Sequence, residues 1–156
     1  MLLLSKEDYM KVINEEYKFS FEIPDGYKEF AKEDYPKYRF DPSTLNILVK
    51  SEGPIPHTIS LNRDVEVKDE DDYVSLVLLN IENMGKMGLA VTSHLHHISN
   101  NRRIDIIYSH IKLIRYVTYM TTIRNMTVAC STEIKEINDE NDRIIEKMFD
   151  SIKEID

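Results

Sequence analysis

Four β-like segments follow one another between residues 89 and 132, with only short polar turns between them. We expect strands over 89–98, 103–111, 113–120 and 126–132, because these runs are rich in β-branched and aromatic residues. The turn Ser99-Asn100-Asn101-Arg102 suits a tight hairpin, since asparagine tolerates the positive φ that such turns require. Turns this short can join antiparallel strands, whereas parallel strands need a crossover of a dozen or more residues. This region therefore predicts an antiparallel meander.

Two amphipathic helices bracket this meander. The first, over residues 70–85, starts within the four acids of residues 69–72, where a helix N-terminus favours negative charge, and we expect it to be deeply packed. The second runs over residues 139–153. The apolar positions of the first are Val74, Leu76, Val77, Leu78, Leu79, Ile81 and Met84, and those of the second are Ile144, Ile145, Met148, Phe149 and Ile152.

The first third of the chain predicts further strands. Residues 17–23 alternate apolar and polar and end at the turn Pro24-Asp25-Gly26, and residues 45–50 and 57–61 predict a second pair of strands. Residues 5–14 suit a helix start or a strand equally, and residues 27–43 predict irregular structure. The order of elements favours an α+β fold, an antiparallel β-sheet flanked by helices, in one domain over residues 1–156. Residues 1–14 are a candidate for a loosely attached N-terminal segment.

Charge and cysteine content restrict the compartment and the partners. The net charge of −8 disfavours nucleic acid, and five basic residues of the β-region predict a solvated sheet face: Arg102, Arg103, Lys112, Arg115 and Arg124. Cys130 is the only cysteine and lies in an apolar strand, which indicates a buried thiol and a reducing compartment. The three leucines at the start are too few for a signal peptide, and no apolar run approaches ~20 residues. We therefore expect a cytoplasmic protein that does not bind membranes.

The strongest candidates for chemistry are the histidines of the first meander strand. If the hairpin turns at Asn100-Asn101, His96 lies opposite Asp105 and His94 lies opposite Ile107. We expect Asp105 to pair with His96, on a face that also carries His94. A carboxylate beside a histidine can orient it for base chemistry or metal binding. The alternative to a functional site is a purely structural role, in which these residues form the polar side of a sheet with cross-strand charge pairs. Because zinc sites use three or four ligands, we predict no metal, catalytic or cofactor site, and keep His94, His96 and Asp105 as the metal candidates.

Two short motifs resemble the PsbP-like family, which includes the Ran-binding Mog proteins. An aromatic strand ends in a Pro-x-Gly-aromatic turn at Tyr17-Lys18-Phe19-Ser20-Phe21-Glu22-Ile23-Pro24-Asp25-Gly26-Tyr27, and a final helix ends in Phe149-Asp150-Ser151-Ile152. The resemblance covers about residues 10–153. It implies an antiparallel sheet with helices on both faces and a role without catalysis, with partners that range from photosystem subunits to a small GTPase.

Three functions remain open from the sequence. The leading hypothesis is a non-catalytic protein-binding or structural module with an unknown protein partner, which the acidic net charge predicts to present basic residues. The second is a metal-dependent or His/Asp-assisted enzyme centred on His94, His96 and Asp105. The third is a small-ligand carrier with a pocket between sheet and helix.

Overall fold

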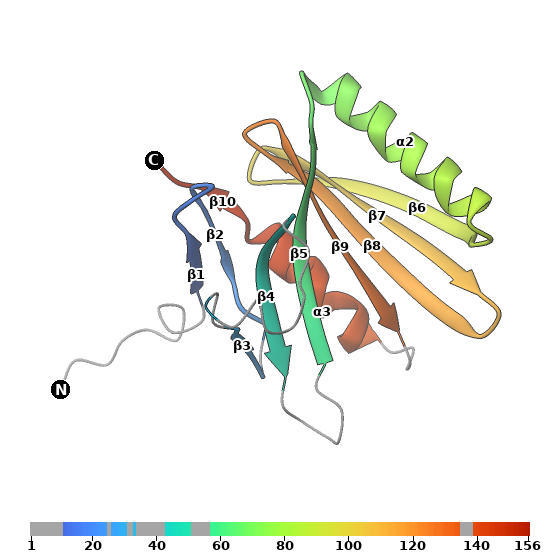
Figure 1. The fold of residues 1–156 in the computed structure, drawn as a ribbon, viewed down its shortest axis with the longest axis horizontal. Helices are drawn as coiled ribbons and strands as arrows, with labels where there is room; N and C mark the ends of the chain where they lie inside the picture. The colour runs from blue at the N-terminus through green and yellow to red at the C-terminus, as the bar shows by residue number, and fades with distance from the viewer. Residues whose placement is uncertain (1–10, 25, 31–32, 34–42, 51–56, 135–138) are drawn as a thin grey trace.

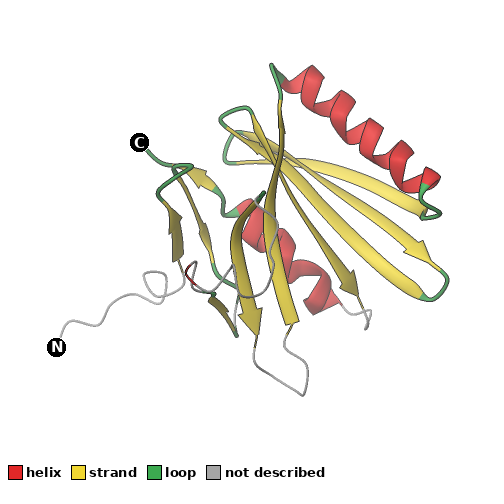
Figure 2. Ribbon diagram, in the orientation of Figure 1, coloured by secondary structure: helices red, strands yellow, loops and turns green. Residues whose placement is uncertain are grey.

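The computed structural model describes residues 11–24, 26–30, 33, 43–50, 57–134 and 139–156. The described part of the chain forms two sheets and two long helices (Figures 1 and 2). In chain order the elements are β1 (Lys11–Asn14), β2 (Phe19–Glu22), β3 (Tyr27–Glu29), β4 (Thr44–Lys50), β5 (His57–Glu66), α2 (Glu70–Lys86), β6 (Ala90–Ser99), β7 (Arg102–Ile111), β8 (Ile114–Ile123), β9 (Met126–Ile134), α3 (Asp139–Asp150) and β10 (Lys153–Glu154).

The larger sheet has seven strands in the order β3-β4-β5-β9-β8-β7-β6. Every neighbouring pair in it is antiparallel, which confirms the predicted α+β class and the meander of β6 to β9. The predicted hairpin turn is also confirmed, because Asn100 and Asn101 both have positive φ between β6 and β7. The smaller sheet, in the order β1-β2-β10, joins the beginning of the described chain to its end.

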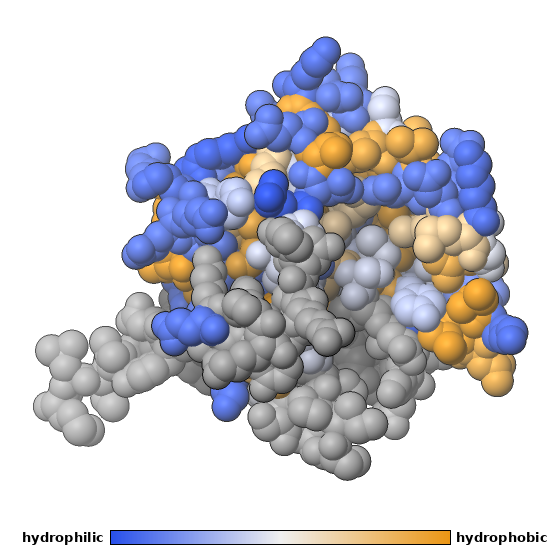
Figure 3. All heavy atoms as spheres, in the orientation of Figure 1, coloured by the Kyte–Doolittle hydropathy of each residue, from blue (hydrophilic) through white to orange (hydrophobic). Residues whose placement is uncertain are grey.

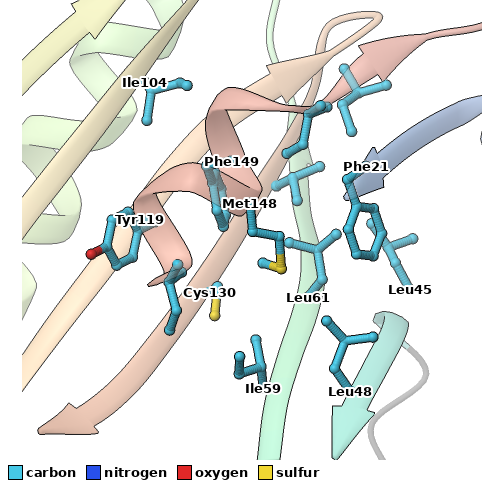
Figure 4. Packing of buried hydrophobic residues seen from close by; sticks show 14 of the residues in the cluster. Phe21, Leu45, Leu48, Ile59, Leu61, Ile104, Tyr119, Cys130, Met148 and Phe149 are labelled. Atoms are coloured by element: carbon cyan, nitrogen blue, oxygen red, sulfur yellow. The ribbon is translucent and has the colours of Figure 1, made fainter. Parts of the chain in front are cut away.

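The face of the large sheet that α3 covers carries the main core (Figure 4). Alternate residues of β7, β8 and β9 point into this core, and the α3 residues Met148 and Phe149 fill it. The rings of Tyr119 and Phe149 lie 5.5 Å apart between centroids. Phe19 and Phe21 of β2 complete the layer, so the small sheet and α3 enclose a common apolar volume.

A smaller core lies on the opposite face, beneath α2. It consists of Val67, Tyr73, Val77, Ile107 and Met120. The prediction that α2 is deeply packed is wrong, since Leu78 and Leu79 are 55% and 49% exposed. The helix contacts mainly the edge strand β6, so only one narrow stripe of it meets the sheet (Figure 1). That stripe is centred on Tyr73 and Val77, one turn apart.

The remaining differences from the sequence expectations lie at the ends of strands. β2 begins at Phe19 because Lys18, at φ 56°, closes a turn from β1. Residues 11–14 form β1 and pair with β2, while residues 1–10 lie outside the described residues. β5 continues to Glu66, beyond the strand predicted over residues 57–61, and residues 27–29 form β3 instead of irregular chain. α3 ends at Asp150, and the chain continues into β10.

The two PsbP-like motifs meet in space at Ser151. The Ser151 hydroxyl donates to the Met148 carbonyl at 2.6 Å and accepts the Glu22 amide hydrogen at 2.8 Å. This serine therefore joins the end of α3 to β2. The Pro-x-Gly turn forms as expected, with the Tyr27 amide donating to the Pro24 carbonyl and Gly26 at φ 85°. No helix in the described part of the chain has the length and apolarity that a bilayer crossing requires.

Candidate functional site

The predicted register of the β6–β7 hairpin is confirmed. His96 pairs with Asp105, and His94 pairs with Ile107. The expected contact is wrong, however, because the histidine that reaches Asp105 is His94, with Nε2 2.7 Å from Oδ2. Side chains two residues away on the facing strand lie within reach of each other in a sheet, which permits this diagonal contact. His96 is exposed, and its ring centroid lies 6.4 Å from that of His94.

Asp105 is fully buried and has charged or polar partners at both oxygens. Arg103 donates from Nε to Oδ1 at 3.0 Å and from Nη2 to Oδ2 at 3.1 Å. Such a two-pronged contact is the strongest common geometry between a guanidinium and a carboxylate. Its hydrogen bonds to Asp105 raise the pKa of Arg103. The carboxylate is thus held in place by Arg103 and His94 together.

Tyr73 of α2 covers this cluster, and the sequence had not indicated it. Burial, followed by the negative charge of Asp105, raises the pKa of the Tyr73 phenol. The hydroxyl is buried, yet it has no hydrogen-bond partner of normal geometry in the described part of the chain. The signal for Tyr73 was its spacing of four residues from Val77, which places both on one side of α2.

The chemistry open to this cluster is limited by its burial. Asp105 can hold the His94 ring in one orientation, as an orienting carboxylate does in general-base catalysis. The carboxylate itself is 0% exposed and so does not reach a solvent-borne substrate. Arg103, Asp105 and His94 form a bonded cluster, and the exposed imidazole of His96 lies beside it.

A hollow of about 550 Å³ lies at the other end of the β6–β7 hairpin, beside β10. Its lining includes Arg102 and Arg124, and both side chains donate hydrogen bonds to backbone carbonyls of the C-terminal segment. Arg102 is only 8% exposed, so the predicted solvated face is wrong for this residue; it donates to the carbonyls of Thr122 and Ile152. Arg124 donates to the carbonyls of Lys18 and Ile155. Because these guanidinium groups already bond to backbone carbonyls, their role at the hollow is to hold the chain segments together.

Apolar side chains gather at the opposite end of the sheet, where α2 ends and β7 turns into β8. We call this surface the apolar tip; it consists of Met87, Ile111, Leu113 and Ile114. Leu113 is 99% exposed and Met87 is 75% exposed, and Gly88 lies against the Ile111 side chain. Figure 1 places the end of α2 and the β7–β8 turn at the same end of the molecule, and Figure 3 shows hydrophobic atoms gathered there.

Comparisons with known proteins agree with the α+β sandwich. No protein-family model matches the sequence, and no curated protein matches it. Among solved structures, the chain is similar to cyanobacterial PsbP (CyanoP) from Synechocystis sp. PCC 6803, at 10% identity and a TM-score of 0.61 over 92% of this chain and 91% of that chain. It is also similar to the Saccharomyces cerevisiae Ran-binding protein Mog1p, at 12% identity and a TM-score of 0.57 over 94% of this chain and 95% of that chain. The protein therefore has the PsbP/Mog fold, as the two motifs predicted.

Proposed function

We propose that the protein is a non-catalytic module that binds a protein partner through the apolar tip. The observation that carries this proposal is the exposure of Met87 and Leu113 beside Ile111 and Ile114. Apolar side chains that are contiguous at the surface mark interaction sites more often than single exposed ones do. Ile111, Leu113 and Ile114 of the tip lie at a tight turn between the paired strands β7 and β8, while Met87 is added from the end of α2.

The charges beside the tip indicate what kind of partner fits it. Lys112 lies in the β7–β8 turn and Arg115 follows Ile114, while Lys86 at the end of α2 is paired with Glu82 at 3.4 Å. The tip is therefore apolar with a basic rim, although the net charge of the whole chain is −8. A partner with an apolar recess and acidic neighbours complements it. This differs from the basic partner that the net charge alone predicted, because the local charge at the tip has the opposite sign.

A protein partner is consistent with the fold comparison. Mog1p, which shares the fold, is a Ran-binding protein. A basic apolar surface also suits an anionic membrane, but the overall charge of −8 opposes approach to anionic lipid. The protein partner is therefore the proposal that we make, and membrane binding is an outcome that its test distinguishes.

The enzyme and carrier alternatives have less support. The Asp105 carboxylate, which is the carboxylate that bonds His94, is buried and is also bonded to Arg103. The hollow beside β10 is lined by polar turn residues and does not lie between sheet and helix. Localisation in the cytoplasm stays a prediction from the sequence.

The test begins with the wild-type protein and two variants as bait in the native extract. The tip variant carries both Leu113→Glu and Met87→Glu, which add negative charge to the apolar tip. The control variant, Ile13→Glu, adds a negative charge at an exposed apolar position of β1, at the other side of the molecule (Figure 1). A protein recovered by wild type and Ile13→Glu but lost with the tip variant is then purified, and its affinity is measured by calorimetry. We expect the tip variant to weaken that affinity by about 2 kcal/mol or more, as loss of a central apolar contact does.

Two results would contradict the proposal. The first is equal affinity of the purified partner for the wild type and the tip variant. The second is binding of the wild type to anionic phospholipid vesicles, lost in the tip variant, with no protein captured; the tip would then be a membrane contact. Circular dichroism of each variant checks that the fold is retained.

A further inference from the structure

One histidine and two carboxylates meet where β6 ends beside the last turn of α3. His97 comes from β6, and Glu146 and Asp150 come from α3. His97 Nε2 lies 2.5 Å from Asp150 Oδ1, and one ligand atom from each of the three side chains lies within 4.8 Å of the other two. In the part of the chain that the structure describes, this is the one group of three His, Cys, Asp or Glu side chains so arranged. It lies on the opposite face of β6 from His94 and His96.

The electrostatics of the two carboxylates call for a cation. Glu146 and Asp150 are four residues apart on one helix, a spacing at which like charges repel each other. Asp150 is the final residue of α3, where the backbone carbonyls add partial negative charge, and Lys147 is the basic residue of that last turn. The side chain that the sheet places against them is an imidazole, which can share a cation with them as a ligand.

We propose that His97, Glu146 and Asp150 bind one divalent transition-metal ion of the zinc class. An imidazole nitrogen with carboxylate oxygens suits zinc, cobalt or nickel, whereas calcium and magnesium prefer oxygen alone. Three protein ligands leave a fourth position for water, and His97 and Asp150 are 33% and 38% exposed, so solvent reaches the site. Tetrahedral ligands about 2.1 Å from zinc lie ~3.4 Å from one another. The His97–Asp150 contact must therefore open by about 1 Å, which side-chain rotation supplies.

The backbone around the site is already fixed. Ser99 Oγ and Asn100 Nδ2 each donate to the Asp150 carbonyl at 2.9 Å, so the end of β6 and the end of α3 are joined before any ion binds. A bound ion would add a second connection between the edge strand β6 and the helix α3. The sequence candidates are less suited, because Asp105 is already occupied by Arg103 at both oxygens.

The experiment uses untagged full-length protein that has been treated with a chelator. Calorimetric titration with Zn²⁺ should saturate at one ion per chain, and Co²⁺ should give the visible absorption of a tetrahedral complex. His97→Ala, Glu146→Gln and Asp150→Asn should each weaken binding by at least roughly the tenfold that loss of an outer partner of a metal ligand costs. The matched control is His96→Ala, which removes the neighbouring exposed imidazole on the other face and should leave the affinity unchanged.

Three results would overturn the proposal. They are no Zn²⁺ binding by the wild type, wild-type affinity for Zn²⁺ in all three ligand variants, or loss of Zn²⁺ binding in His96→Ala. Glu146→Gln and Asp150→Asn keep the size of the side chain, so they test the site even if His97→Ala fails to fold. In the wild type, the ring resonances of His97 should shift on Zn²⁺ addition, while those of His94 should not.

Discussion

Ser151 lies where the end of α3 meets β2, and its hydroxyl bonds to both elements. Ser151→Ala should lower the free energy of unfolding by about 1 kcal/mol, since the Met148 carbonyl and the Glu22 amide lose one partner each. Urea denaturation measures this difference. Ser75→Ala, at an exposed position of α2, is the control and should change it by less than about 0.5 kcal/mol. Equal effects of the two substitutions would show that the joint contributes nothing.

The substitution Tyr73→Phe removes one oxygen atom and so tests whether the Tyr73 hydroxyl bonds to the buried Asp105 carboxylate. This hydroxyl lies near Asp105 without a hydrogen bond of normal geometry. Tyr73→Phe should leave the free energy of unfolding unchanged or raise it by up to about 1 kcal/mol, because an unpaired buried hydroxyl is unfavourable. The measurement is again urea denaturation. A loss of about 1–3 kcal/mol would show instead that the hydroxyl donates to Asp105.

Cys130 is buried in β9, and this burial raises the pKa of its thiol from 9.0 to about 12. The native protein should therefore react very slowly with a disulfide reagent at neutral pH, and the urea-unfolded protein should react quickly. Because the folded pKa is the higher one, the stabilisation from the protonated thiol is complete below about pH 9. It is lost as the pH rises towards about 12. Rapid modification of the native thiol would contradict this.

At the scale of elements, the two helices differ in how much of each is buried. Phe149 of α3 is fully buried, so Phe149→Ala should lower the free energy of unfolding by about 3–5 kcal/mol. Leu78 of α2 is half exposed, and Leu78→Ala should change it by less than about 0.5 kcal/mol. The sequence predicted both as core. Thermal or urea unfolding of the two variants side by side checks the correction.

The type and order of the elements were predictable from the sequence, and the depth of their packing was not. Alternation and asparagine turns are local signals, so β6 to β9 were predicted with small errors at the ends, and so was the register of β6 against β7. Whether Leu78 meets the sheet depends on how far α2 lies over the edge strand, which no local pattern contains. Likewise, the contact of His97 with Asp150 joins residues 53 positions apart. For His94, His96 and Asp105, the sequence predicted the shared face and the register, while register alone did not determine which histidine reaches the carboxylate, because diagonal neighbours are also within reach.

At the scale of the whole molecule, the single large sheet separates two cores of unequal size. The core beneath α3 draws on both sheets, whereas the core beneath α2 has five buried members. Free energy of local opening follows the apolar contacts that opening breaks. The amide hydrogens of α2 should therefore exchange with deuterated water through a partial opening that costs less than global unfolding.

From that inequality we predict a stable scaffold with one layer, α2, that opens first. When α2 lifts, the scaffold of β4, β5, β8, β9 and α3 keeps its own apolar volume, and the sheet edge at β6 and β7 meets solvent. Native-state hydrogen exchange in low denaturant should show α2 amides in a faster cooperative group than α3 and β8 amides. A single group containing both helices would show that the two layers open only together. If the layer opens in this way, we expect the Asp105 carboxylate, which is 0% exposed in the closed fold, to gain water as a partner and the His94–Asp105 face to become accessible to molecules in solution.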